Sequence, residues 1–150
     1  MAYGKKSLMK QLGKIEKMAN ESLQNEVAEI VKQEMIEAIN KSVYDAYIPS
    51  QYTRRGTKGG FKDIRNLRSS VEDGELKVWN ITRAVGDDKG QYLDKILVDG
   101  DKYTWGYSRI YQSQPLPRDF IQATYNRLIQ SKAHKEALKT ALQKRGLTVV

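Results

Sequence analysis

Apolar residues in the first third of the chain recur at the spacing of an α-helix. Between residues 7 and 44 they follow one another in steps of three and four, which places their side chains on one helical face. The stripe consists of Leu8, Leu12, Ile15, Ala19, Leu23, Val27, Ile30, Val31, Met35, Ala38, Ile39 and Val43. The pattern predicts one long amphipathic helix, or two helices separated near residues 20–22, where Asn20 or Ser22 would cap the second.

A proline and a glycine-rich basic stretch follow this helix. Pro49 ends the helical pattern because it forces the preceding residue out of the helical conformation and has no N–H to donate. Residues 53–62 contain three glycines, four basic residues and no acid. This composition predicts a mobile surface loop.

The middle of the chain contains strand-like runs. Residues 67–82 alternate apolar and polar positions on both sides of Glu-Asp-Gly-Glu at 72–75, and Asp-Gly in that context predicts a β-hairpin. Residues 92–98 are compatible with a strand or a short helix. Their apolar spacing of i, i+3 and i+4 favours a helix ended by Gly100. Residues 102–111 are aromatic and β-prone, with Gly106 as a bulge.

The last third is again helical. Pro115 and Pro117 bracket a turn, Asp119 is placed to begin one helix, and a second helix over residues 132–144 ends at Gly146. The order of elements predicts a single α+β domain over residues 1–150. Its parts are an N-terminal helix (1–43), an extended basic loop (44–66), and a small antiparallel β-sheet with C-terminal helices packed on it (67–150).

Composition narrows the classes of function. Hydrophobic residues make up 39% and charged residues 29% of the chain, which suits a small domain with extended surface or a subunit whose core is completed by neighbours. The net charge of +8 favours an anionic partner or an acidic protein ring. The absence of cysteine excludes disulfides and thiolate chemistry. No run approaches the length of a membrane span, so we expect a soluble intracellular product with no membrane partner.

Candidate catalytic chemistry is weak throughout. The lone His134 excludes a histidine-based zinc site, argues against a catalytic triad, and is expected at the surface. The Lys58-Gly59-Gly60 run lacks the order of residues that defines a phosphate-binding loop. Two sets of carboxylates with a lysine have too few oxygen ligands for a dedicated Mg²⁺ or Ca²⁺ site. These sets are Asp63 with Glu75 and Lys77, and Asp99 with Asp101 and Lys102. We therefore predict no catalytic residue, no metal site, no cofactor and no nuclease activity.

The basic stretch has two functional interpretations beside that of a solvated loop. In the first it binds nucleic acid: the cations contact phosphates and Tyr47 or Tyr52 stacks on bases. The cations in question are Arg54, Arg55, Lys58, Lys62, Arg65 and Arg68. In the second the loop orders against a neighbouring subunit, where arginine forks meet carboxylates.

Four motifs, taken in order, resemble the tail-completion or head–tail joining minor structural proteins of long-tailed bacteriophages. The resemblance covers residues 43–128. The first motif is Tyr44, Tyr47, Pro49, Tyr52, Arg54 and Arg55, and the second is Gly59, Gly60, Phe61 and Asp63. The third is Leu93, Ile96, Leu97, Val98 and Gly100, and the fourth is Pro117, Arg118, Phe120 and Ile121.

This resemblance implies a non-enzymatic ring subunit, a hexamer, at the head–tail junction of a virion assembled in the host bacterial cytoplasm. It implies three partners: further copies of the chain, the head–tail connector or head completion protein, and the major tail tube protein. Genome DNA would pass through the lumen of the ring. The expected interface comprises Tyr44, Tyr47, Pro49, Tyr52, Arg54, Arg55, Lys58, Gly59, Gly60, Phe61 and Lys62.

Overall fold

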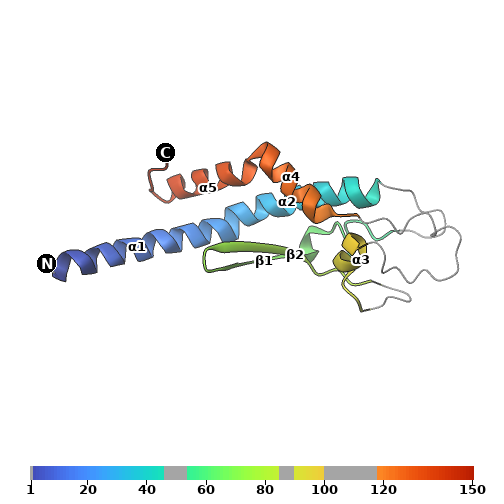
Figure 1. Cartoon of the computed structure of the whole chain (residues 1–150), viewed down its shortest axis with the longest axis horizontal. Helices are drawn as coiled ribbons and strands as arrows, with labels where there is room; N and C mark the ends of the chain where they lie inside the picture. The colour runs from blue at the N-terminus through green and yellow to red at the C-terminus, as the bar shows by residue number, and fades with distance from the viewer. Residues whose placement is uncertain (1, 46–53, 85–89, 100–117) are drawn as a thin grey trace, which may run out of the picture. The chain divides into compact units, whose positions relative to one another are not determined.

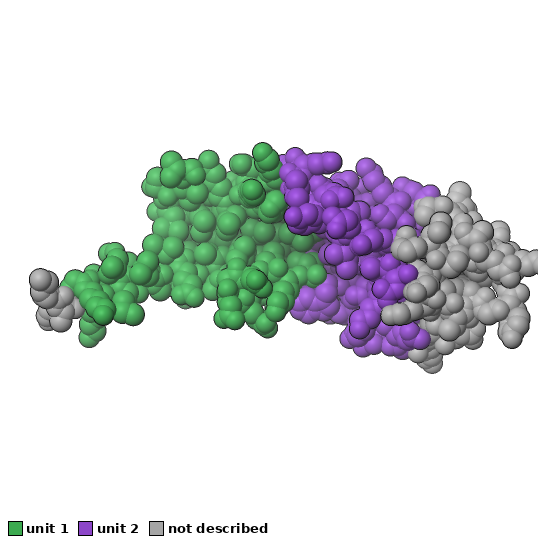
Figure 2. Space-filling model, in the orientation of Figure 1, with its two compact units in different colours: residues 1–31, 69–78, 132–150 green, residues 32–68, 79–131 purple. Residues whose placement is uncertain are grey.

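The computed structural model describes residues 2–45, 54–84, 90–99 and 118–150 (Figure 1). The chain divides into two compact units (Figure 2). Unit 1 consists of Met1–Val31, Ser69–Val78 and Lys132–Val150, and unit 2 of Lys32–Arg68 and Trp79–Ser131. In the described part of the chain, no helix combines the length and the hydropathy that crossing a bilayer requires.

The N-terminal helix is continuous, and it contains two π-helical turns. Its segments are α1 (Ala2–Ser22), η1 (π-helical, Leu23–Val27), α2 (Ala28–Ile39) and η2 (π-helical, Asn40–Tyr44). The prediction of one long helix is confirmed. The alternative of two helices capped at Ser22 is wrong, because Ser22 has helical dihedral angles and its hydroxyl donates to the Met18 carbonyl oxygen at 2.7 Å. The irregularity begins one residue later, as a π-helical turn.

In unit 1, helix α5 (Ala133–Lys144) packs against α1 and η1. Val27, Ala28 and Ala141 are buried there. Arg145, just after α5, donates two hydrogen bonds to the Glu26 carboxylate. Nη1 lies 2.8 Å from Oε1 and Nη2 lies 3.2 Å from Oε2. A two-pronged arginine–carboxylate pair fixes direction as well as distance, so it sets how the end of α5 meets η1.

The predicted end of α5 is confirmed. Gly146 has φ = 89° and donates its N–H to the Gln143 carbonyl oxygen at 3.0 Å, while Leu147 donates to Leu142 at 3.1 Å. These two bonds form a Schellman motif, which needs a residue in the left-handed region that glycine adopts without a Cβ penalty.

The predicted hairpin is also confirmed. Strands β1 (Leu67–Glu72) and β2 (Glu75–Asn80) form a two-stranded sheet. Asp73 and Gly74 at the turn both have positive φ, 51° and 77°. Two successive positive φ values define the type I′ turn that Asp-Gly favours.

Unit 2 contains the larger apolar core. Phe61 and Phe120 meet edge to face with ring centroids 5.0 Å apart, and both are almost fully buried. The open choice for residues 92–98 is decided in favour of a helix, α3 (Leu93–Asp99), which buries Ile96 and Leu97. The other buried apolar residues of this unit are Met35, Ala38, Ile39, Val43, Leu67 and Ala84.

Helix α4 (Phe120–Ser131) starts where the sequence predicts, and it packs against η2. The Asp119 carboxylate accepts a hydrogen bond from the Gln122 backbone N–H at 2.9 Å, as an N-cap residue does. The α+β class is confirmed: a long N-terminal helix, a small antiparallel sheet and C-terminal helices. The predictions for Pro49, Gly100, residues 102–111, Pro115 and Pro117 concern positions outside the described residues.

Replacing Asp119 by alanine should destabilise the protein by about 1 kcal/mol, because the first turn of α4 loses the acceptor of one backbone N–H. Thermal unfolding followed by circular dichroism should show a midpoint roughly 2–4 °C lower. Asp119→Asn is the matched control, since its amide oxygen can still cap the helix. Equal losses in the two variants would contradict the capping role.

Candidate interaction site

Tyr44, at the end of η2, holds the basic loop, which we define as residues 54–62. Its carbonyl oxygen accepts a hydrogen bond from Arg54 Nη1 at 2.9 Å, and its hydroxyl donates to the Arg55 carbonyl oxygen at 2.8 Å. The Arg54 guanidinium carbon and Lys62 Nζ lie 5.1 and 4.6 Å from the centroid of the ring. Cations at these distances are attracted to the π-face of tyrosine. One side chain therefore tethers both ends of the loop.

The Tyr44 hydroxyl acts as a donor because it keeps its proton. Burial raises its pKa, and this effect outweighs the backbone N–H groups of Lys62 and Phe61 and the charges of Arg54 and Arg55, which favour the phenolate. A neutral phenol donates to the carbonyl of Arg55, whereas a phenolate would face that oxygen without a proton between them.

Gly60 marks a close approach within the basic loop. A Cβ atom on Gly60 would lie 1.8 Å from the Arg55 carbonyl oxygen and 2.3 Å from that of Gly56. These contacts are with backbone atoms, which cannot move aside as a side chain can. Gly59 beside it has φ = 73°, a conformation that costs most residues energy. The pair of glycines lets the loop fold back tightly on itself.

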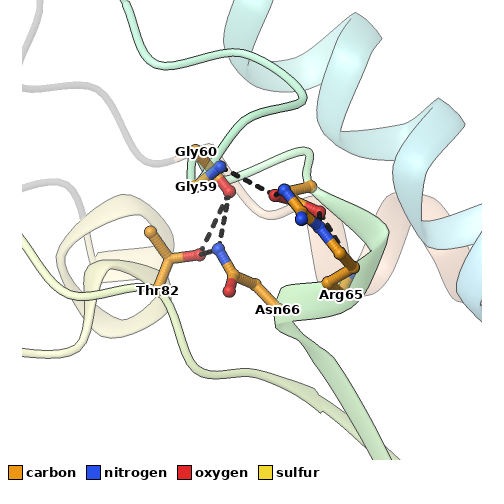
Figure 3. Close-up of polar contacts among 6 residues, drawn as sticks. Gly59, Gly60, Arg65, Asn66 and Thr82 are labelled. Atoms are coloured by element: carbon orange, nitrogen blue, oxygen red, sulfur yellow. Dashed lines mark hydrogen bonds and ion pairs between the residues drawn. The ribbon is translucent and has the colours of Figure 1, made fainter.

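The carboxylate of Asp63 clamps the far end of the loop (Figure 3). One oxygen, Oδ2, accepts from the Gly59 N–H and from Arg65 Nη2, both at 2.7 Å. The other, Oδ1, accepts from the backbone N–H and the Nε of Arg65, both at 3.0 Å. The Asp63 side chain is only 4% exposed, whereas that of Arg65 is 74% exposed. Hydrogen bonds from Arg65 and then from Gly59 hold the pKa of Asp63 far below its usual range.

Two carbonyl groups of the loop accept hydrogen bonds from side chains at or near the ends of the hairpin, and Figure 3 shows those made to Gly60. The Gly60 oxygen accepts from Asn66 Nδ2 at 3.0 Å, and from the Thr82 hydroxyl at 3.4 Å. The Phe61 oxygen accepts from Asn80 Nδ2 at 2.8 Å. Buried backbone acceptors need such partners, and here side chains before β1, at the end of β2 and after it provide them.

The expectation of a surface loop is therefore wrong at Gly60 and Phe61. Gly60 and Phe61 are buried, and Phe61 is only 3% exposed. Glycine serves here to permit close backbone contact rather than motion. The surface part is confirmed for Arg55, Lys58 and Gly59, which are exposed.

Several of the basic side chains already bind groups of the protein itself. Arg54 binds the carbonyl of Tyr44, Arg55 Nη2 donates to the carbonyl of Arg83 at 2.9 Å, and Arg65 binds Asp63. Lys58 and Arg68 lie exposed on the surface. Of the other predicted site residues, Tyr47, Pro49 and Tyr52 lie outside the described residues. The structure thus brings together Tyr44, Arg54, Arg55, Gly59, Gly60, Phe61 and Lys62.

The residues considered as metal ligands or catalytic groups do not form such a site among the described residues. Both oxygens of Asp63 are occupied by Arg65 and Gly59. Among the described residues, no group of three His, Cys, Asp or Glu side chains has a geometry that would hold a metal ion. Asp101 and Lys102 lie outside the described residues. His134 is half-buried on α5 rather than fully at the surface.

Sequence reasoning missed Asn66, Asn80, Thr82, Arg83 and the packing of Phe61 on Phe120. One sequence feature could have indicated these contacts: an asparagine stands at each end of the hairpin, with Asn66 just before β1 and Asn80 at the end of β2. Asparagine is depleted in strands, so its presence at strand ends can indicate side-chain bonds to a neighbouring loop. The partners of those bonds are distant in sequence, and no spacing rule identifies them.

The family model described as YomN matches residues 5–144, and the chain belongs to this family. The match runs from the first turns of α1 to the end of α5 and includes the whole basic loop. No curated protein and no solved structure matches the chain significantly.

Gly60→Ala should destabilise the protein by about 3 kcal/mol, because the new methyl group collides with two backbone carbonyls. Urea unfolding at pH 7 measures the effect. Gly56→Ala is the matched control: its Cβ would meet only Lys62 Cε at 3.6 Å, an ordinary contact, so its stability should stay within about 1 kcal/mol of the wild type. Similar stability of the two variants would contradict the close approach.

Asp63→Asn should destabilise the protein most above pH 5 and progressively less on acidification. The pKa of Asp63 is lowered in the folded state, so from the unfolded value of about 3.9 downward the unfolded chain takes up the proton first. The stabilisation by the carboxylate is complete above the unfolded pKa and declines as pH falls through the folded one.

The measurement is the difference in unfolding free energy between wild type and Asp63→Asn at pH 7, 5, 4 and 3. Glu72→Gln is the control, because Glu72 pairs with Lys77 on the surface at 3.1 Å and exposed pairs contribute little. A difference in unfolding free energy between wild type and Asp63→Asn that does not change with pH would contradict the stabilising role of the Asp63 carboxylate.

Proposed function

We propose that this member of the YomN family is a non-enzymatic structural subunit of a bacteriophage virion. In this proposal it forms a ring at the head–tail junction, as a tail-completion or head–tail joining protein that couples the connector to the tail tube. The ring is hexameric, and genome DNA passes through its lumen. The protein assembles into the virion in the host bacterial cytoplasm.

The observation that carries the proposal is an exposed apolar face on α4. Ile121, Tyr125 and Ile129 follow at intervals of four residues and are 51, 58 and 52% exposed. Phe120 and Thr124, on another side of the same helix, are buried. The helix therefore already has a buried side, and its second apolar side remains open to a partner. A subunit that completes its burial on assembly has this property, whereas a monomeric enzyme has no need of it.

The basic loop supports a docking role. Its backbone is held by Tyr44, Asp63 and Asn66, so an approaching partner meets a preformed edge and loses little entropy in ordering it. Arg55 and Lys58 lie on its exposed side, where acidic groups of an adjoining ring would meet them. In the proposal Tyr47, Pro49 and Tyr52 secure the base of this edge.

The assignment to a phage neck is supported by the resemblance of the four motifs described above. The second of them contains two residues on which the close fold of the basic loop depends, Gly60 and Asp63. The proposed partners are further copies of the chain, the connector or head completion protein, and the major tail tube protein.

The rival is a small DNA-binding protein that uses the charges between Arg54 and Arg68. Arg54, Arg55 and Arg65 already donate to groups of the protein, which leaves fewer donors for phosphates. This arrangement weighs against DNA as the ligand of the loop.

Negative-stain microscopy and mass measurement of the full chain, alone and mixed with purified connector and tail-tube rings, test the proposal. We expect closed rings or ring-bound particles. Tyr125→Glu should abolish them, because it places a charge within the apolar face. Gln130→Glu is the matched control, with the same charge change at an exposed polar position of α4, and it should assemble normally.

A monomer under all of these conditions would overturn the proposal. Titration with duplex DNA distinguishes the DNA-binding protein from the ring subunit. Tight binding that falls steeply with salt and weakens in a variant with both Arg55 and Lys58 changed to alanine would favour the DNA-binding protein. Weak binding that these changes leave unaltered agrees with the ring.

A further inference from the structure

The first half of α1 displays an apolar stripe that the other described residues leave uncovered. Every residue from 4 to 17 is exposed, including Leu8 at 56%, Leu12 at 55% and Ile15 at 44%. In Figure 1 this blue end of α1 runs beyond α5, which covers the later turns of the helix. A polar sequence would be expected on a stretch of helix that touches nothing else.

The spacing of the stripe is that of a coiled-coil seam. Leu8, Leu12, Ile15 and Ala19 follow in steps of four, three and four. This is the alternation of the a and d positions of a heptad repeat, over two heptads. Lys5, seven residues before Leu12, ends the seam on its N-terminal side.

The charges on this helix lie away from the stripe. Lys6, Lys10, Lys14 and Lys17 recur in steps of four, four and three. Lys10 is two residues from both Leu8 and Leu12, which is about 200° around the helix from each. The lysines therefore form a row opposite the apolar seam.

The positions that flank the seam are nearly free of charge. They are Met9, Gln11, Glu16 and Met18, which occupy the e and g positions of the repeat. When two identical helices meet along this seam, no two like charges face each other, and Glu16 lies opposite Gln11 or Met9 of the other copy. The same placement disfavours an anionic bilayer or an acidic helix as the occupant, because either would need the lysines beside the stripe.

We propose that the first half of α1 pairs with the same segment of a second copy of this chain, as a short two-stranded coiled coil. The seam is Leu8, Leu12, Ile15 and Ala19, and the lysine row faces water. This inference does not depend on the proposed phage function, since it rests on the exposure and the heptad spacing of α1 alone.

The pairing should be weak and dependent on concentration. Two heptads bury less surface than a stable dimer interface of about 1,000 Å² needs, and helices of this length are marginal by themselves. Here the rest of the N-terminal helix provides the template, so the segment is already helical when the copies meet.

Sedimentation equilibrium of the full chain over a wide concentration range tests the pairing. We expect the average mass to rise with concentration from 17.2 kDa, and to approach twice that value in Tyr125→Glu, in which the proposed ring contact is removed. Leu12→Glu should raise the dissociation constant at least about tenfold, since a charge then enters the seam. Lys10→Gln, which also lowers the net charge by one but lies opposite the seam, should associate like the wild type. Both positions are exposed, so neither variant should unfold.

A cysteine reporter identifies the surface independently. The chain has no cysteine, so Leu8→Cys should give a disulfide-linked dimer on oxidation if the helices run parallel. A Leu12→Cys/Ile15→Cys double variant should do so if they run antiparallel, because Leu12 then lies opposite Ile15 of the other copy. Failure of both variants to cross-link in a protein that nevertheless forms rings would overturn the α1 pairing and leave the ring proposal standing. Cross-linking in a protein that forms no ring, alone or with connector and tail-tube rings, would support the α1 pairing and overturn the ring proposal.

The other outcomes also overturn the inference. These are a wild type of 17.2 kDa at every concentration, equal association of Leu12→Glu and Lys10→Gln, and a monomer that instead co-sediments with vesicles of anionic phospholipid through Leu12.

Discussion

The buried carboxylate of Asp63 is the constraint on which the basic loop depends. It accepts four hydrogen bonds, three from Arg65 and one from Gly59, and a buried charge requires that degree of compensation. Because Arg65 lies just before β1, the same contact ties the loop to the start of the hairpin. Without it, the backbone of Gly59 and Gly60 would lose the anchor that holds its tight fold.

Around that anchor, the loop illustrates how a flexible-looking sequence becomes a defined surface. Phe61 fills the core beside Phe120, and the side chains of Asn66 and Asn80 donate to the carbonyl oxygens of Gly60 and Phe61. The basic residues are thereby sorted into two groups. Arg54 and Arg65 bind groups of the protein itself, the Tyr44 carbonyl and the Asp63 carboxylate. Lys58 is exposed, where a partner would meet it. In the proposed docking role, such a loop would meet its partner with a fixed shape rather than by folding on contact.

Burial and exposure of apolar side chains are distributed unevenly along the helices. The N-terminal helix is covered from Val27 onward but exposed over residues 4–17, and α4 is buried at Phe120 but open at Tyr125. A monomer gains nothing from holding these side chains in water. Both features suit a chain that completes its apolar burial by association, with other copies or with neighbouring rings.

The amino-acid sequence by itself determined the elements that depend on local rules. Helical spacing determined the long helix, Asp73-Gly74 determined the hairpin turn, and Asp119 and Gly146 determined the ends of α4 and α5, because each signal lies within a few residues of its effect. Tertiary structure alone decided the form of the basic loop. Its composition predicted mobility, but Asp63, Asn80 and Phe120 hold it through contacts that extend up to 59 residues along the chain, from Phe61 to Phe120. Spacing within a window cannot reveal such contacts, since their energy comes from burial and pairing that exist only once the chain has folded.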